Sequence, residues 1–214
     1  MTTIPANTTL RPFSFRTIDD ARTLGTIYFE AGEGVQILCK VTTEISSDPL
    51  ISSRRNAKVK VSVIGGASNP ALINRLENVF SGIIPSDTLE KMQIHVRFEV
   101  LKCDGVLHDY LINVGQYTMM SANLLLKDNV VSATCILTSQ GEFILDPSEA
   151  DLKNSVGQVR LVHSVQRDKI CDFEIVGLIR EGDELREAIT LAVAATKTVS
   201  KKMLDLVTAE ESQA

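Results

Sequence analysis

Tryptophan is absent from the sequence, and aromatic residues of all kinds make up 5% of its 214 residues. An excess of positive charge is absent too, because 22 Lys and Arg face 27 Asp and Glu, which gives a formal net charge of -5 at pH 7. A protein that coats nucleic acid by charge alone relies on a basic face. The composition argues against that class, while it leaves room for local contacts with nucleic acid inside a larger assembly.

Clustered cysteines and long apolar runs are also lacking. No two cysteines have the spacing of a zinc site, and each lies in an apolar or strand-like run: Cys39, Cys103, Cys135 and Cys171. We expect buried, reduced thiols, which suit a reducing compartment. No segment reaches the roughly 18 uninterrupted apolar residues of a membrane span, and the first residues contain no apolar signal region. We therefore expect a soluble intracellular protein with no membrane partner, no metal site and no cofactor.

The residues that are present, 44% of them hydrophobic, are enough for a core of ordinary size. The first half is rich in strand patterns. Between "GTIYFEAG" and "VQILCKVTTE", Gly32 and Gly34 predict a hairpin turn, and "KVKVSVIGG" alternates apolar and polar residues after the polar loop "SSRRNAK". Along "VQILCKVTTE" four residues are expected to face the same way, inward: Val35, Ile37, Cys39 and Val41. A helix follows, with Asn69 as its cap and Pro70 in its first turn.

The second half alternates between strand and helix patterns. "MQIHVRFEVLKCDG" predicts a strand, and residues 109–126 predict a helix that is apolar on most sides and therefore buried against a sheet. "VVSATCILT", "GEFILD", "VGQVRLVHSVQ" and "RDKICDFEIVGLI" predict four more strands, with a turn at residues 140–142. A last helix begins with Asp183 as its cap. This order predicts an α+β fold of mixed sheets packed against helices, rather than a doubly wound parallel sheet.

Taken together, these segments resemble the RNase PH family, which includes bacterial phosphorolytic exoribonucleases and the ring subunits of the RNA exosome. The resemblance rests on the order of "LRPFSFR", "GTIYFEAGEGVQILCKVTTEI", "IHVRFEVLKCDG" and "GEFILDPSEAD", followed by a strand and a closing helix. It implies an RNase PH-like fold of the ribosomal protein S5 domain 2-like group. It also implies a flexible N-terminus over residues 1–9, a single domain over residues 10–207 and a disordered tail over residues 208–214.

Phosphorolysis needs cations that hold inorganic phosphate and an acid or metal-binding carboxylate near the RNA 3′ end. Active family members carry a Gly-Thr-Arg stretch where this chain has "DGVLHDY", so Leu107 and His108 take the places of the hydroxyl residue and the arginine. An imidazole cannot supply the permanently charged fork of a guanidinium. The family's catalytic aspartate corresponds to Gln158, and an amide is neither a general acid nor a good magnesium ligand.

The acids that remain in this region need not be catalytic. We interpret Asp146, which precedes Pro147, as a turn former that binds backbone N–H groups of its own turn, and Glu149 and Asp151 as exposed residues. The degenerate site thus consists of four positions: His108, Asp146, Asp151 and Gln158. Away from it, we interpret His95 and Arg97 as solvated or interface residues and His163 as a structural histidine.

The resemblance implies a catalytically inactive structural subunit of the exosome core ring, which helps to form the channel that guides RNA for 3′-to-5′ processing and degradation. The implied partners are other RNase PH-like subunits in a hetero-oligomeric ring, S1/KH-type cap subunits and single-stranded RNA, and the implied locations are the nucleus, nucleolus and cytoplasm. The candidate RNA-binding residues form one basic cluster: Arg54, Arg55, Lys58 and Lys60. Arg11 and Arg16 are further candidates for phosphate contacts, and no aromatic residue is interleaved for base stacking.

Two other interpretations stay open at this point. The chain is an active phosphate-dependent 3′-to-5′ exoribonuclease if the ungapped alignment to Gln158 is wrong. It is an α+β interaction protein unrelated to RNA if only the fold group is right. Co-purification with ring subunits favours the exosome ring and its absence favours the interaction protein, whereas phosphate-dependent trimming of a short RNA by the purified chain would establish the exoribonuclease.

Overall fold

The computed structural model describes residues 9–45, 58–66, 68–85, 92–179 and 182–211. Its elements, in chain order, are β1 (Phe13–Thr17), β2 (Gly25–Ala31), β3 (Val35–Ile45), β4 (Lys58–Ile64), α2 (Pro70–Ile83), β5 (Met92–Lys102), α3 (Leu107–Ser121), β6 (Val130–Thr138), β7 (Phe143–Leu145), α4 (Glu149–Lys153), β8 (Ser155–Ser164), β9 (Lys169–Gly177) and α5 (Asp183–Glu211). None of the helices in the described part of the chain is long and apolar enough to cross a membrane.

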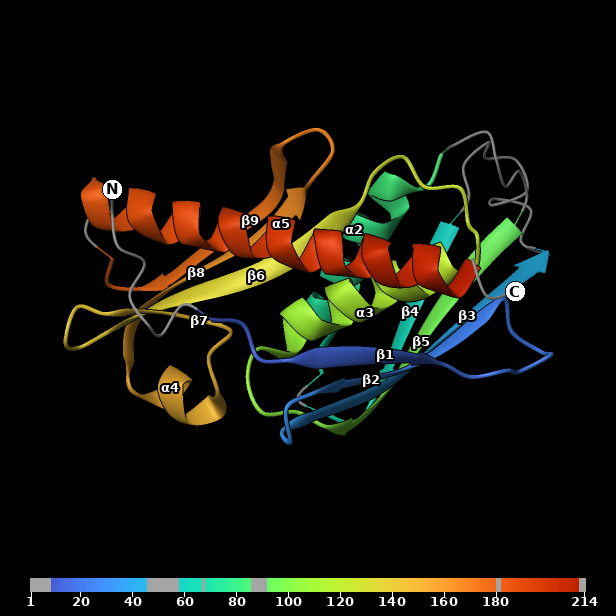
Figure 1. Cartoon of the computed structure of the whole chain (residues 1–214), viewed down its shortest axis with the longest axis horizontal. Helices are drawn as coiled ribbons and strands as arrows, with labels where there is room; N and C mark the ends of the chain where they lie inside the picture. Colours follow the sequence, from blue (N-terminus) through green and yellow to red (C-terminus); the bar gives the residue numbers. More distant parts are fainter. Residues whose placement is uncertain (1–8, 46–57, 67, 86–91, 180–181, 212–214) are drawn as a thin grey trace. The chain divides into compact units, whose positions relative to one another are not determined.

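The chain forms two compact units. The five-stranded unit comprises residues 13–103 and 111–129, and its sheet has the order β1-β2-β3-β5-β4 (Figure 1). The four-stranded unit comprises the residues before 13, residues 104–110 and the chain from 130 onward, and its sheet has the order β7-β6-β8-β9. The predicted α+β class is confirmed, because sheets and helices alternate in this mixed way rather than in a doubly wound parallel sheet. The predicted limits of a single domain at residues 10 and 207 stay a prediction.

In the five-stranded unit, alternation along the strands decides which face of the sheet is buried. The predicted inward residues of β3 are fully buried: Val35, Ile37, Cys39 and Val41. β4 and β5 are parallel and are joined by α2, whereas the other neighbours are antiparallel. The predicted cap is confirmed, since the side chain of Asn69 accepts a hydrogen bond from the Leu72 N–H at 2.9 Å. Helix α3 packs closely at Gly115, where an added Cβ would meet the ring atoms of Phe80 and Phe98.

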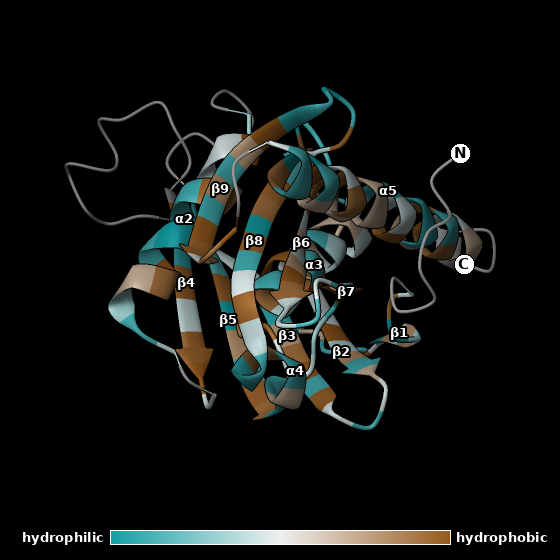
Figure 2. Cartoon of the chain, turned by 90° about the vertical axis from the view of Figure 1, so that its left-hand side faces the viewer, coloured by the Kyte–Doolittle hydropathy of each residue, from teal (hydrophilic) through white to brown (hydrophobic). Residues whose placement is uncertain are grey.

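The four-stranded sheet is antiparallel throughout, and α5 lies along one of its faces (Figure 1). The core between helix and sheet is built from small and medium apolar side chains: Ala133, Cys135, Leu137, Phe143, Leu145, Val159, Leu161, Ala188, Ala192 and Ala195. Figure 2 shows the strands of this sheet side by side, with β9 at one end. β9 is therefore an edge strand.

The structure corrects two predicted helix ends. The predicted helix over residues 109–126 spans Leu107–Ser121 instead. Asn123 adopts a positive φ of 53° and its N–H donates to Met120 O, while the N–H of Leu124 donates to Met119 O. These two bonds form a Schellman motif, which ends the helix before Leu124 despite the apolar residues that follow. The predicted cap Asp183 is the first residue of α5, because the carbonyl of Gly182 accepts the hydrogen bond from Arg186 N.

Three further expectations change. The segment 208–211, expected to be disordered, continues α5, while residues 212–214 and the expected flexible residues 1–8 lie outside the described ones. The acidic turn after β7 contains a short helix, α4. No disulfide joins the four cysteines, which all lie in described segments, but only Cys39 and Cys135 are buried and Cys171 is exposed. Burial raises the pKa of both buried thiols to about 12, so they stay protonated.

Candidate functional site

The turn after β7 is organised by an ion pair between Asp146 and Arg11, which are 135 residues apart in the sequence. Arg11 Nε donates to Asp146 Oδ2 at 3.1 Å, and Arg11 Nη2 donates to Oδ1 at 3.0 Å. The backbone N–H of Arg11 donates to Oδ2 as well, at 3.1 Å. The two side chains are only 22% and 16% exposed. This bidentate pair is the strong form of an arginine–carboxylate contact.

Tyr110 completes this cluster. Its hydroxyl donates to Asp146 Oδ1 at 2.5 Å and accepts from Arg11 Nη2. Burial, together with the Asp146 carboxylate, raises the pKa of Tyr110, so the phenol keeps the proton that it donates. Both carboxylate oxygens of Asp146 are thus already engaged by residues of this chain.

Glycine at position 105 permits the close approach of Arg11. Gly105 has a φ of 132°, and an added Cβ would lie 2.7 Å from Arg11 Nη2 and 2.6 Å from Pro147 O. Arg11 also donates to the carbonyl of Asp104 at 2.8 Å, so it connects the segment after β5 with the turn after β7. Asp146 does adopt a turn conformation, with a φ of 51°, but the expected hydrogen bonds are wrong, since its carboxylate binds Arg11 and Tyr110 instead of the N–H groups of its own turn.

Asp151 also has a structural task that the sequence interpretation missed. Its carboxylate accepts from the N–H of Ser148 at 2.9 Å, while the Ser148 Oγ accepts from the N–H of Asp151 at 3.2 Å. This is a capping box at the start of α4. The spacing Ser148 to Asp151 could have indicated it. Glu149 is exposed as predicted and pairs with Lys153 at 2.8 Å.

A shallow pocket of about 340 Å³ lies over this turn, lined by Thr9, Arg11, Ile144, Leu145, Asp146, Ser148 and Asp151. Arg11, the one cation among these lining residues, is already paired with Asp146, and the pocket contains a second carboxylate, that of Asp151. An incoming phosphate would meet a net negative charge at this pocket. In the described part of the chain, no three His, Cys, Asp or Glu residues are grouped so that they could hold a metal ion. The cation of this pocket is therefore already neutralised before any phosphate arrives.

The degenerate positions His108 and Gln158 do not line this pocket. His108 lies in the first turn of α3 and is 4% exposed, with Nδ1 3.4 Å from Asp109 Oδ1. Asp109 in turn accepts from Ser132 Oγ at 2.5 Å. His108 is thus part of a buried polar chain, and it does not stand as a surface group at the position of the family's arginine.

Gln158 lies on β8, opposite Ile136 on one side and Val176 on the other. Two residues further along the same face stands Arg160, which the sequence interpretation missed although period-2 alternation could have found it. Arg160 Nη1 pairs with Glu174 Oε2 at 3.0 Å. Gln158 Nε2 and Arg160 Nε are buried and make no hydrogen bond within the described residues. A cation is therefore present beside Gln158, but a carboxylate already neutralises it.

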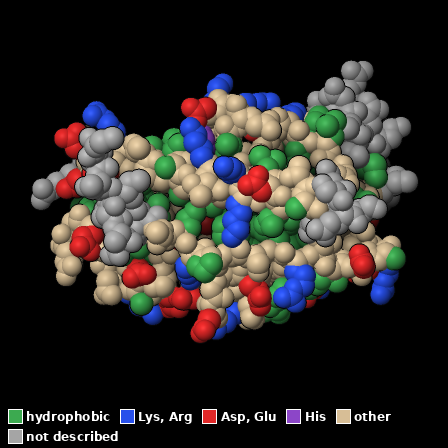
Figure 3. Space-filling view, viewed as in Figure 1, with side chains coloured by type: hydrophobic (Ala, Val, Ile, Leu, Met, Phe, Trp, Pro, Cys, Tyr) green, Lys and Arg blue, Asp and Glu red, His purple; other side chains and the backbone are tan. Residues whose placement is uncertain are grey.

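The predicted basic cluster can be placed only in part. Arg54 and Arg55 lie outside the described residues, as does the side chain of Lys58, whereas Lys60 is exposed on β4. Two further residues were candidates for phosphate contacts. The prediction for Arg11 is wrong, because Asp146 binds its guanidinium. Arg16 is exposed and lies beside the ring of Tyr28. On the face seen in Figure 3, basic and acidic side chains are interspersed, without a continuous basic surface among the described residues.

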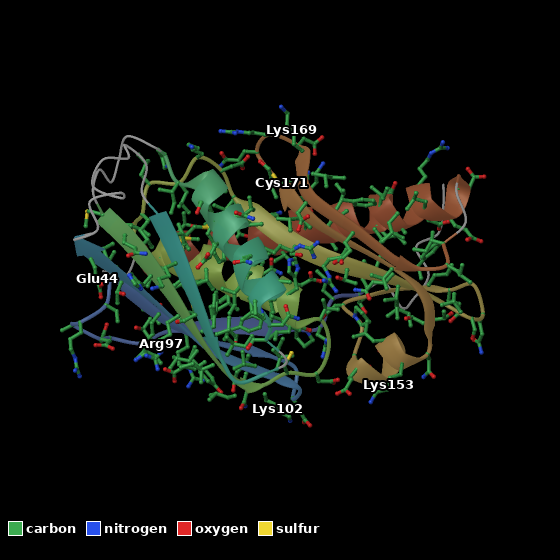
Figure 4. The ribbon with its side chains drawn as sticks, turned by 180° about the vertical axis from the view of Figure 1, so that it is seen from behind. Glu44, Arg97, Lys102, Lys153, Lys169 and Cys171 are labelled. Carbon is green, nitrogen blue, oxygen red and sulfur yellow. The ribbon has the colours of Figure 1, made fainter. Side chains whose placement is uncertain are left out.

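His95 and Arg97 lie two residues apart on β5, and each is near an acid. His95 Nε2 is 3.6 Å from Glu44 and Arg97 Nε is 3.3 Å from Glu99. Figure 4 shows Glu44 and Arg97 on strands of the five-stranded sheet. A hollow of about 480 Å³ lies there, lined by Asp20, Arg22, Thr23, Lys40, Thr42, Ser62, His95 and Arg97. Asp20, the one acid among these lining residues, lies 3.5 Å from Lys40 Nζ and 4.0 Å from Arg22 Nε.

His163 is a structural histidine, and this prediction is confirmed. It is 1% exposed; its Nδ1 is 3.0 Å from Thr196 Oγ1 and its Nε2 is 3.2 Å from Asp168 Oδ1. It thereby connects β8, the β8–β9 turn and α5. Lys197 reaches the same Asp168 oxygen at 2.9 Å.

The five-stranded and four-stranded sheets with their helices define the RNase PH-like α+β class, and comparison with solved structures confirms this predicted fold. The chain is similar to the structure of rice (Oryza sativa) Rrp46, with 20% sequence identity, a TM-score of 0.83 and coverage of 95% of this chain and 98% of that chain. It is also similar to a chain of an archaeal exosome core, with 12% identity, a TM-score of 0.73 and coverage of 93% and 89%. No protein-family model and no curated protein matches the sequence at a significant level.

Proposed function

We propose that this chain is a catalytically inactive structural subunit of the RNA exosome core ring. The observation that carries the proposal is the likeness to rice Rrp46 over almost the whole of both chains. A second likeness, to a chain of an archaeal exosome core over 93% of this chain, supports placing the chain in a core of that kind. In this role the chain forms part of the wall of a channel that guides RNA for 3′-to-5′ processing and degradation.

The charges around the degenerate site support inactivity. A phosphorolytic site needs cations that are available to inorganic phosphate. Arg11 is engaged by Asp146, and Arg160 is engaged by Glu174. In the ungapped alignment that the resemblance implies, Gln158 takes the position of the catalytic aspartate, and its amide cannot act as an acid.

The proposed partners are other RNase PH-like subunits in the ring, S1/KH-type cap subunits, and single-stranded RNA in the channel. The exposed apolar residues on β9 support a need for protein partners. For RNA we propose backbone contacts through Arg54, Arg55, Lys58 and Lys60. As locations we propose the nucleus, nucleolus and cytoplasm, where an exosome would act.

Affinity purification of the tagged chain from native extract tests the assembly. We expect several RNase PH-like paralogues and S1-type proteins to co-elute in near-equal amounts, as judged by mass spectrometry and native mass. A chain that elutes without any of them would overturn the ring assignment and favour an interaction protein unrelated to RNA.

A phosphorolysis assay tests the inactivity separately. Purified chain, a single-stranded RNA labelled at its 5′ end, inorganic phosphate and magnesium should give no ladder of shortened products. The matched variant is Arg160→Gln, which removes the cation beside Gln158 and leaves the Asp146 cluster intact. Phosphate-dependent shortening by the unaltered chain that Arg160→Gln abolishes would show an active exoribonuclease instead.

A further inference from the structure

The hollow of about 480 Å³ next to His95 and Arg97 lies on the outward face of the five-stranded sheet. Along their strands, Lys40 and Arg97 stand next to the fully buried residues Val41 and Val96, so alternation directs these cations away from the core. None of the described lining residues is apolar or aromatic, and the proposed function gives none of them a role. The hollow is therefore a separate candidate for a binding site.

The β1–β2 loop forms one wall of this hollow. Thr26 stands opposite Lys40 on the outward face, yet it is only 2% exposed, because the loop folds over it. Thr23 Oγ1 lies 2.8 Å from Thr26 Oγ1, and Thr23 N donates to Asp20 O at 3.0 Å. Arg22, in the same loop, has a side chain that is 96% exposed. The strands thus supply a floor and the loop supplies a wall, which makes the site concave.

Positive charge is concentrated on the floor of the hollow. Lys40 of β3 stands directly opposite Arg97 of β5 in the strand register, so the two cations are neighbours. Like charges in such a pair lower the stability of a sheet. With Arg22 in the wall, three cations face one carboxylate, that of Asp20, among the described lining residues. The pocket over the turn after β7 has the opposite balance, one cation and two carboxylates.

Acids at the rim reduce this excess without cancelling it. Glu99 approaches Arg97 Nε at 3.3 Å, and Glu44 is 3.6 Å from His95 Nε2. Lys60 of β4, which is opposite His95 in the register and is exposed, adds a further cation. When these neighbours are counted, four Lys and Arg side chains face three carboxylates. Water screens the exposed pairs, so each acid holds its cation only weakly against an incoming anion.

A phosphate group matches this arrangement better than a carboxylate does. A phosphate monoester carries about −1.5 to −2 charges near pH 7 and three acceptor oxygens, whereas a carboxylate carries one charge and two oxygens. The phosphate can therefore accept from Lys40 and Arg97 and still reach a hydroxyl group. Thr42 and Ser62 supply such hydroxyl groups.

The lining also restricts the rest of the ligand. A nucleobase would find no aromatic ring for stacking among the described lining residues. An apolar group would find no apolar wall there. The volume lies within the range of small-molecule sites and leaves room for a small polar group beyond the phosphate.

We propose that this hollow binds a small phosphate monoester with a polar organic part, a phosphorylated sugar or polyol, whose phosphate is held by Lys40 and Arg97. Inorganic phosphate is the smallest probe of the same chemistry. The inference does not depend on the proposed function. All lining residues belong to the five-stranded unit, whereas the degenerate positions belong to the four-stranded unit.

NMR titration of the purified chain locates the site. Glycerol phosphate should shift the amide signals of the lining residues and bind more tightly than inorganic phosphate, because its polyol contacts the hollow as well. Glycerol alone should cause no such shifts. Equal shifts on addition of sodium chloride at matched ionic strength would show screening only and overturn the proposal. Tighter binding of inorganic phosphate would assign the site to the free ion and overturn the monoester.

Two glutamine substitutions on β5 form the matched pair of variants. Arg97→Gln should weaken the binding of glycerol phosphate about tenfold or more, since it removes a charged hydrogen-bond donor. Lys102→Gln, on the same strand (Figure 4), should leave binding unchanged, because Lys102 Nζ donates to the carbonyl of Glu33 and does not line the hollow. Far-UV circular dichroism establishes that both variants fold. Binding that survives Arg97→Gln would overturn the proposal.

Asp20→Asn should act in the opposite direction. It removes the carboxylate that competes with the ligand for Lys40, so binding should tighten about threefold. Weaker binding in this variant would mean that Asp20 itself holds the ligand, and would overturn the assignment to an anion.

Lys40→Gln separates a binding role from a structural one. Binding should weaken about tenfold or more. The melting temperature should stay unchanged or rise, since the variant removes a like charge opposite Arg97. A lower melting temperature together with unchanged binding would show a structural lysine and overturn the proposal.

Two further outcomes would place a different ligand or a different site. Loss of binding in Arg160→Gln but not in Arg97→Gln would assign the phosphate to the degenerate positions. Single-stranded RNA that shifts the same signals at a lower concentration than glycerol phosphate would assign the hollow to nucleic acid. Either result would overturn the proposal. Failure of ring subunits to co-purify would instead count against the exosome assignment alone.

Discussion

The five-stranded unit fills the space between sheet and helix with aromatic rings, whereas the four-stranded unit organises the turn after β7 with charges. Phe80 and Phe98 are fully buried against Gly115 of α3, and Phe15 stacks on Tyr117 with ring centroids 3.8 Å apart. In the turn after β7, Asp146 instead binds Arg11 from the segment before β1, and both side chains are partly exposed. Apolar burial stabilises the fold without depending on the direction of each contact. The ion pair, in contrast, holds three chain segments in one arrangement: those that contain Arg11, Tyr110 and Asp146. The difference indicates that the aromatic core depends on apolar burial, whereas the geometry of the degenerate site depends on the pairing of charges.

The largest expected effect is in the aromatic core. Phe98→Ala should lower the free energy of unfolding by about 3–5 kcal/mol, because it removes a fully buried ring and leaves a cavity. Urea unfolding followed by circular dichroism measures the change. On the same strand, Leu101→Ala is the control, since Leu101 is 62% exposed and should change stability by less than about 0.5 kcal/mol.

Asp146→Asn should have the second-largest effect, about 2–3 kcal/mol, because it leaves the Arg11 guanidinium without its counter-charge. We place it below the range for fully buried pairs, since water partly screens both groups. Glu149→Gln, in the adjacent exposed helix, is the control and should change little. A loss larger than that of Phe98→Ala would reverse the comparison between the two regions.

The end of α3 tests the backbone of the five-stranded unit. Asn123 has a φ of 53°, so Asn123→Ala should lower stability by about 1–2 kcal/mol. Asn123→Gly should cause no loss, because glycine adopts this conformation readily. Thermal unfolding of the two variants side by side measures the difference, and equal losses would contradict the role assigned to the Schellman motif.

Ser148→Ala tests the capping box of α4 in the four-stranded unit. The expected loss is about 1 kcal/mol, since the N–H of Asp151 loses its acceptor. Hydrogen–deuterium exchange should show faster exchange confined to residues near 148–153. Protection that stays unchanged would mean that neighbouring segments, rather than the cap, hold α4.

The smallest effect is a pH dependence at Asp168. The hydrogen bond and charge of Lys197, with a smaller contribution from His163, lower the pKa of Asp168 below its ordinary value of 3.8. Its stabilisation is therefore present above pH 4 and is lost as the pH falls through the lowered folded value. In Asp168→Asn, the free energy of unfolding should therefore fall slightly less steeply as the pH drops below 4. At neutral pH the variant should differ from the unaltered chain only by a small, constant loss of stability. An unchanged acid limb would mean that the Lys197 contact contributes nothing.

Much of the fold could be predicted because its signals are local. The alternation in β3 marked the buried residues Val35 and Cys39 correctly, and Asn69 before Pro70 marked the start of α2. The end of α3 was missed because apolar residues continue past it, while the positive φ of Asn123 depends on a two-bond motif rather than on hydropathy.

The candidate site was harder to predict. The resemblance was enough to name substituted positions such as His108 and Gln158. It could not predict whether another cation takes the place of the missing arginine. Arg160 stands on the same strand as Gln158 and proved to be paired with Glu174. A single sequence does not contain that pairing, because it depends on the register between β8 and β9.

The sequence by itself determined the strand faces, the capped start of α2 and the α+β class, since the first two depend on residues within a few positions of one another and the class follows from the order of these local patterns. Only the tertiary structure decided that Arg11 neutralises Asp146 across 135 residues and that β9 is left at the edge of its sheet. The physical reason is the sequence distance over which each interaction acts. Periodicity and capping act within one element, whereas the pairing of charges and the order of strands depend on the path of the whole chain.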